Sequence, residues 1–87
     1  MYSVVLVTVA SAKEGKKIAL TLLKNKYAAC INIIPKVESF FWWKGKIDQA
    51  QEGLLVIKTH KSKVSKVIKK VTQVHSYEVC EVISLVS

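Results

Sequence analysis

Residues 28–43 combine a run rich in β-branched side chains, a proline and four consecutive aromatic residues. The run predicts a strand up to Pro35, which cannot donate a hydrogen bond to a neighbouring strand and so marks a bend, a bulge or a sheet edge. Strand character resumes after the proline and reaches the last aromatic residue, where Lys44-Gly45-Lys46 predicts a turn. The stretch therefore predicts a long hairpin arm, around which the rest of the fold must be built.

Strands and helices alternate on either side of this arm. Residues 3–10 form a near-continuous apolar run dominated by valine, which predicts a buried strand. Residues 12–27 carry apolar side chains at helical spacing, behind a capping-box pattern at Ser11 and Glu14. After the polar residues 48–53, the patterns predict a third strand, a second helix and a fourth strand, at residues 54–59, 62–74 and 79–86.

The resulting order, β-α-β-β-α-β, predicts an α+β fold of the ferredoxin-like type, in which one antiparallel sheet carries both helices on one face. With 87 residues, the chain is expected to form a single domain, residues 1–87. In the second strand, Cys30, Asn32 and Ile34 are expected to share one face of the sheet. Because the strands are apolar on both faces, we expect a second copy of the chain to cover the face without helices.

The composition restricts the partners and the compartment. The net charge of +8 favours anionic partners, but all fourteen basic residues are lysine. Arginine is the usual residue for reading base edges and for gripping phosphate with two hydrogen bonds. We therefore attribute the charge mainly to solubility and expect no nucleic-acid partner. Two cysteines are too few for a disulfide framework and favour a reducing, cytoplasmic compartment. No apolar run approaches the ~18 residues of a membrane helix, so we expect no membrane partner.

Five segments, in order and spread over nearly the whole chain, resemble the CutA family of divalent-cation tolerance proteins. They are VVLVT at 4–8, AACINIIP at 28–35, WKGKI at 43–47, KT at 58–59 and HSYEVCEV at 75–82. The resemblance implies a tight homotrimer whose long hairpin arms reach neighbouring subunits. It also implies a role in tolerance of copper and other divalent metals, without enzymatic activity. The family trimer is similar to that of PII signalling proteins, so the alternative is a structural or signalling trimer that binds a small ligand or a partner protein in its intersubunit clefts.

The sequence departs from the family pattern at several positions. Family members usually have His-Pro-Tyr and then a proline or alanine before a glutamate, whereas Ser76 and Cys80 stand at those two positions here. Some members carry a further cysteine on the first strand, as a proposed copper ligand, where this chain has Val7. The family normally continues past the fourth strand into a short strand and a C-terminal helix. We therefore expect residues 1–87 to form a CutA-like domain without that segment.

Thiolate and imidazole are the ligands that suit copper or another divalent metal of its class. The resemblance carries this role onto Cys30 and His75, to which this sequence adds Cys80 as a further ligand and Glu78 as a helper. Two other interpretations stay open. A thiol in an apolar strand commonly serves packing, and a histidine at the end of the second helix suits the negative end of the helix dipole.

The aromatic cluster on the arm consists of Phe40, Phe41, Trp42 and Trp43. Successive strand residues point to both faces, so a single hairpin could not bury all four. They could anchor a neighbouring subunit or stack on single-stranded RNA. RNA-recognition modules carry aromatic residues on their first and third strands, and residues 54–57 contain none. We therefore expect these four residues to form an oligomer interface.

Three further polar residues have weaker signals. Asp48 and Glu52 lie in the return of the hairpin and could take part in acid–base chemistry or bind hard cations. Their glutamine-rich surroundings favour solvated loop residues instead. His60 precedes a lysine-rich helix without an obvious partner, and we expect it at the surface.

Overall fold

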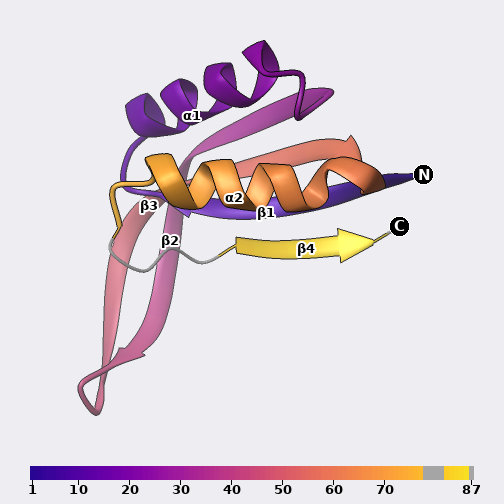
Figure 1. Cartoon of the computed structure of the whole chain (residues 1–87). Helices are drawn as coiled ribbons and strands as arrows, with labels where there is room; N and C mark the ends of the chain where they lie inside the picture. Colours follow the sequence, from indigo (N-terminus) through magenta and orange to yellow (C-terminus); the bar gives the residue numbers. More distant parts are fainter. Residues whose placement is uncertain (78–81, 87) are drawn as a thin grey trace.

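One antiparallel sheet, in the strand order β2-β3-β1-β4, carries both helices on the same face (Figure 1). The computed structural model describes residues 1–77 and the backbone of 82–86. Its elements are β1 (Tyr2–Val9), α1 (Ala12–Lys24), β2 (Cys30–Trp43), β3 (Lys46–His60), the 3-10 turn η1 (Lys61–Lys63), α2 (Val64–Val74) and β4 (Val82–Val86). The predicted α+β order is confirmed. Of the predicted fourth strand at 79–86, residues 79–81 lie outside the described part.

The core lies between the sheet and the two helices. Every second residue of β1 points toward the helices and is buried, as the predicted strand alternation requires. Among the described side chains, the fully buried apolar ones come from β1, β3 and both helices: Val5, Val7, Val9, Ile18, Leu22, Leu55, Ile57, Val67 and Val71. In the described part of the chain, neither helix is long and apolar enough to cross a membrane.

Helix α1 begins and ends with recognisable caps. The Ser11 side chain accepts a hydrogen bond from the Glu14 amide at 3.1 Å, which confirms the predicted N-cap. The helix ends at Lys24, three residues before the predicted end at residue 27. Lys26 adopts a left-handed φ of 58°, and the Tyr27 amide donates back to the Leu22 carbonyl at 2.9 Å. This pattern is the Schellman motif, which sequence reasoning missed because a lysine stands where glycine is usual.

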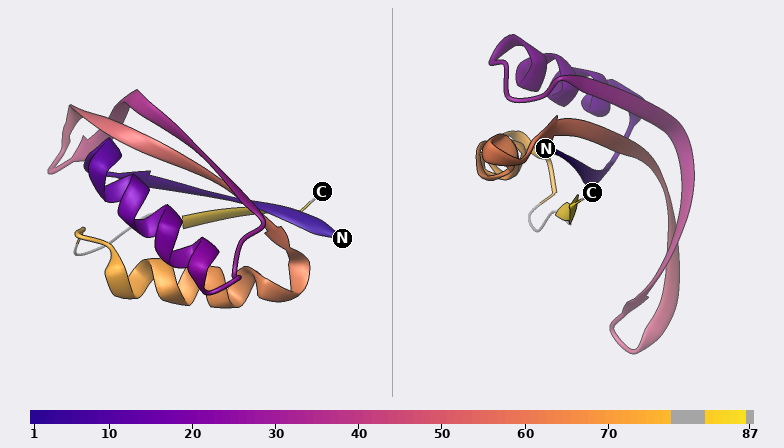
Figure 2. Two further views of the ribbon diagram at one scale, coloured as in Figure 1. Left: turned by 90° about the horizontal axis from the view of Figure 1, so that it is seen from above. Right: turned by 90° about the vertical axis from the view of Figure 1, so that its right-hand side faces the viewer.

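The long arm consists of the paired segments 37–43 and 46–52, which extend beyond the sheet (Figures 1 and 2). Its tip is the predicted turn, in which Lys44 and Gly45 have φ values of 50° and 77°, as a two-residue hairpin turn of type I′ requires. The prediction that residues 48–53 interrupt the third strand is wrong, because β3 runs unbroken from Lys46 to His60. Backbone pairing with β2 keeps this segment extended although its side chains are polar.

The arm leaves the sheet at a β-bulge. Ile34 pairs with Leu54 and Val37 with Glu52, so that Pro35 and Lys36 both lie opposite Gly53. This agrees with the prediction of a bend, bulge or edge at the proline, and β2 is also an edge strand. A Cβ atom on Gly53 would lie 3.0 Å from Val9 Cγ2, so the close approach of β1 to the bulge favours glycine there.

The second face of the sheet has no helix over it in the described part of the chain (Figure 2). We call it the open face. Cys30 pairs with Lys58 and Ile31 with Ile57, which points into the core, so the register places Cys30 on the open face together with Asn32 and Ile34 as predicted. The open-face side chains are Val4, Leu6, Thr8, Cys30, Asn32, Ile34, Leu54, Val56 and Lys58, and none of them is fully buried.

Candidate functional site

His75 is the C-cap residue of helix α2, and its side chain bonds to the end of strand β1. Its Nε2 lies 2.7 Å from the Thr8 carbonyl oxygen, and its Nδ1 lies 3.0 Å from the Tyr77 backbone nitrogen. A carbonyl can only accept and an amide N–H can only donate, so Nε2 carries the proton and Nδ1 accepts. The geometry therefore describes a neutral imidazole with both nitrogens in hydrogen bonds.

Glu14 reaches the same segment from the first turn of α1. Its Oε1 accepts from the Ala10 amide at 3.0 Å, and its Oε2 accepts from the Ser76 amide at 2.8 Å. Burial raises the pKa of the Glu14 carboxyl, but the hydrogen bonds from Ser76 and Ala10 outweigh it and leave the pKa below its usual value. The carboxylate thus ties α1 to the residue after His75, a role beyond the N-terminal capping that the sequence indicates.

Tyr77 extends this connection to the arm. Its hydroxyl donates to Glu52 Oε2 at 2.7 Å, and its ring lies 4.7 Å from the His75 ring. Burial, the hydrogen bond to the Glu52 carboxylate, and the negative charges of Glu52 and Glu14 raise the pKa of Tyr77 to about 12. We call Thr8, Glu14, Glu52, His75, Ser76 and Tyr77 the His75 network.

The network borders a pocket of about 410 Å³ that extends along one side of the arm. Strand alternation in β3 places Asp48, Ala50 and Glu52 on one side of the arm. Phe41, which pairs with Asp48, and Trp43, two residues further along β2, lie on the same side. Tyr77 closes the pocket, which we call the arm pocket. The carboxylates of Asp48 and Glu52, beside two aromatic rings, form an environment that suits a cationic group. The expectation that Glu52 is a solvated loop residue is wrong, because it is half-buried in a strand and bonded to Tyr77.

Of the predicted metal ligands, the structure describes Cys30 and His75, and these two lie apart within one chain. Cys30 is a free, exposed thiol that pairs with Lys58, which in turn pairs with Val4 of β1. His75 contacts Thr8, which lies four residues further along β1, or about 13 Å at the rise of a strand. Cys80 and Glu78 lie outside the described residues. Within residues 1–77 and 82–86, no group of three or more His, Cys, Asp and Glu side chains is arranged to hold a metal ion.

The four aromatic residues of the arm divide between its two sides. The relative exposures are 64% for Phe40, 40% for Phe41, 73% for Trp42 and 59% for Trp43. The register puts Phe41 and Trp43 on the side of the arm pocket and Phe40 and Trp42 on the other side. The chain by itself therefore leaves a large aromatic surface in contact with water, and the predicted interface role of these residues stays a prediction.

Apart from Glu14, which the capping-box spacing indicates, sequence spacing does not reveal the His75 network, and one substitution tests the role of Glu14 in it. Replacing Glu14 by glutamine leaves a single oxygen for two amide donors, so we expect a loss of about 1 kcal/mol in the free energy of unfolding at neutral pH. Because the folded-state pKa is lowered, the contribution of the carboxylate is present above its unfolded pKa and is lost as pH falls through the folded value. Urea titrations of Glu14→Gln below pH 4.5 should thus approach the wild-type curve. The exposed arm variant Glu38→Gln is the control, and equal losses in both variants would contradict the bridging role.

Comparisons with known proteins agree on one family. A family model described as CutA1 divalent ion tolerance protein matches residues 3–87. Protein CutA homolog of Xenopus laevis is 51% identical over 79 residues, which are 91% of this chain and 52% of that protein. Protein CutA 1, chloroplastic, of Oryza sativa subsp. japonica is 44% identical over 82 residues, which are 94% of this chain and 46% of that protein.

A solved structure extends the likeness to the fold. The periplasmic divalent cation tolerance protein CutA from Archaeoglobus fulgidus matches with a TM-score of 0.95 at 37% identity, over 100% of this chain and 84% of that one. The match includes the long β2-β3 hairpin. The chain spans about half the length of the two curated relatives. By their names one relative is chloroplastic and the solved protein periplasmic, so the cytoplasmic location stays a prediction.

Proposed function

The chain belongs to the CutA1 divalent ion tolerance family, and from this premise we propose that it acts in divalent-cation tolerance as a non-enzymatic homotrimer. The family resemblance that the sequence predicts is thereby confirmed. Neither the family description nor the names of the relatives refer to an enzyme. The trimer, the bound metal and the single-domain organisation of residues 1–87 are parts of the proposal.

The observation that carries the trimer is the amount of apolar surface that one chain leaves uncovered. The open face has no helix over it in the described residues, and Ile34 on that face is 43% exposed. The arm adds four exposed aromatic residues. Contiguous apolar surface of this kind marks an interaction site, and the repeated use of one chain is the simplest way to cover it. The count of three subunits follows from the family resemblance.

For the metal, we propose that copper or a related divalent ion binds at Cys30 and His75, which different subunits would supply. The exposed thiol of Cys30 on the open face supports this, because that face is where we expect a second subunit. His75 would have to exchange one of its two hydrogen bonds for the metal, and Nδ1, which accepts only from the Tyr77 amide, is the nitrogen with a lone pair. Cys80 and Glu78 remain proposed as additional ligand and helper.

Isothermal titration calorimetry with Cu(I), Cu(II) and Zn(II) tests the metal part. We expect the assembled protein to bind a copper ion. We expect Cys30→Ser and His75→Ala each to weaken binding by about tenfold or more, since even the loss of a residue that only hydrogen-bonds to a metal ligand commonly lowers metal affinity by about 10–100-fold. Asn32→Ser is the matched control, because Asn32 lies on the same face two residues along β2. Absence of binding by the unmodified protein, or unchanged affinity in both ligand variants, would remove the metal from the proposal.

A further inference from the structure

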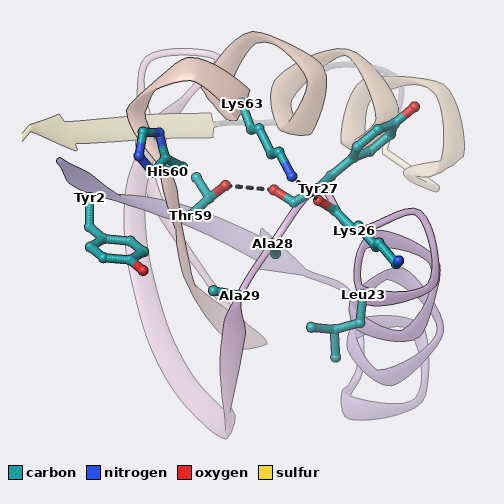
Figure 3. A pocket seen from close by; sticks show the side chains of 9 residues that line it. All are labelled: Tyr2, Leu23, Lys26, Tyr27, Ala28, Ala29, Thr59, His60 and Lys63. Carbon is teal, nitrogen blue, oxygen red and sulfur yellow. Dashed lines mark hydrogen bonds between the residues drawn. The ribbon is translucent and has the colours of Figure 1, made fainter.

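A second hollow lies at the opposite end of the sheet from the His75 network. Its volume is about 430 Å³, and it forms where the start of β1, the end of α1, the entry to β2 and the turn η1 meet (Figure 3). Tyr2 and His60, which pair across β1 and β3, stand at one end of it, and Leu23 and Lys26 stand at the other. We call it the Tyr2–Lys26 hollow.

The backbone around the hollow is held in place by hydrogen bonds from several elements. The left-handed residue Lys26 turns the chain out of α1, and the Thr59 hydroxyl donates to the Tyr27 carbonyl at 2.5 Å. The Ala29 amide then donates to the Lys58 carbonyl at 2.9 Å. Between these fixed points the lining consists of Ala28 and Ala29, whose small side chains leave the space open. The hollow is thus a built feature of the fold rather than a gap between mobile side chains.

The electrostatic character of the hollow is one-sided. The Lys63 ammonium group donates to the Lys26 carbonyl at 2.7 Å, which fixes one of its three N–H groups and leaves two for a ligand. Lys26 also lines the hollow, and Figure 3 shows its ammonium group pointing away from that of Lys63, so the Lys26 side chain would have to turn inward to reach a ligand. Among the described residues that line the hollow none is acidic, and the sequence contains no aspartate or glutamate at 15–37 or 53–77. The fixed Lys63 ammonium group, with the flexible side chain of Lys26 beside it, favours an anion, and a compact point charge such as lysine is an established phosphate binder.

The rest of the lining is apolar or aromatic. The rings of Tyr2 and His60 meet edge to face, with centroids 5.8 Å apart, and Leu23 lies at the far end. The His60 ring is itself held by Ser62, whose hydroxyl lies 3.1 Å from Nδ1. A wall of two rings opposite an aliphatic side chain is a place where a flat apolar group can be buried. The hollow therefore combines an anion-binding part with an apolar part.

We propose that the Tyr2–Lys26 hollow binds a phosphate monoester with a ring-bearing body, with Lys26 and Lys63 holding the phosphate and Tyr2 and His60 contacting the ring. The site is formed by one chain, and it shares no described lining residue with the arm pocket. A hollow of about 430 Å³ has room for a small ligand. A polyanion would instead contact the lysines along the whole of α2.

Amide chemical shifts of the 15N-labelled protein test the proposal with phenyl phosphate as the probe. We expect saturable shifts at Ala28, Ala29 and Lys63, and binding at least about tenfold tighter than that of inorganic phosphate, because only the ester also buries a ring. Lys26→Gln and Lys63→Gln should each weaken binding about tenfold. Lys16→Gln removes the same charge from an exposed position of α1 and should leave the affinity within about twofold.

A third variant keeps the proposal falsifiable if a lysine substitution disturbs the fold. Ala29→Leu adds bulk to the lining without changing the charge, and we expect it to abolish the shifts caused by phenyl phosphate. Equal weakening by Lys16→Gln and Lys63→Gln would show general attraction to lysine and overturn the site. Shifts spread over all the lysines of α2, with RNA oligonucleotide binding more tightly than the ester, would replace it by a polyanion surface. Absence of shifts in the hollow would equally overturn the proposal.

Discussion

Replacing Trp42 and Trp43 together by alanine is expected to convert the assembled protein into monomers that keep their fold. The two side chains are 73% and 59% exposed in the single chain, so their removal costs the monomer little. In an interface, a buried tryptophan commonly contributes 2 kcal/mol or more, and the double change should weaken association by about a thousandfold. Size-exclusion chromatography with light scattering measures the mass directly, and circular dichroism checks that the fold is kept.

The single variants show which side of the arm touches a neighbouring subunit. Trp43 shares its side with Phe41 and the arm pocket, whereas Trp42 shares the other side with Phe40. A larger effect of Trp42→Ala would place the neighbour on the side away from the pocket, and a larger effect of Trp43→Ala would make the arm pocket part of the interface. Gln51→Ala, an exposed polar change on the same arm, serves as the control. An unchanged trimer mass in the double variant would remove both tryptophans as anchors.

The sequence predicts most of the fold because the deciding signals are local. Alternating valines in β1 identify the buried face, Ser11 and Glu14 mark the start of α1, and Pro35 marks the bulge. The sequence pattern does not reveal the strand at residues 48–53, because an arm that is exposed on both sides has no apolar alternation. The left-handed turn at Lys26 was missed for a related reason, since tertiary contacts hold a conformation that lysine does not favour by itself.

The candidate site could be predicted only in part. His75 stands out by residue type and Tyr77 by nearness, but the bond from Tyr77 to Glu52 joins residues 25 positions apart. A signal did exist for Glu52: it continues the even-numbered side of β3, on which residues 54, 56 and 58 lie, once the strand is extended through Gly53. The distance between Cys30 and His75 depends on the sheet register, which single-residue patterns do not reveal. The family resemblance therefore names ligands that one chain keeps apart.

Replacing Tyr77 by phenylalanine is expected to lower the free energy of unfolding by about 1–2 kcal/mol at neutral pH, because a hydrogen bond to a carboxylate is lost and Glu52 keeps no partner there. The pH dependence separates this bond from packing. The folded-state pKa of about 12 lies above the usual 10, so the bond stabilises the protein fully below pH 10 and its contribution disappears as pH rises through 12. The unmodified protein should lose stability in that window by urea titration, and Tyr77→Phe should lose less.

Glu52→Gln should lower the pKa of the Tyr77 phenol, which ultraviolet titration of the tyrosinate measures, whereas the control Glu38→Gln should not. Parallel alkaline curves for Tyr77→Phe and the unmodified protein would contradict the role of this bond in joining the arm to the end of α2.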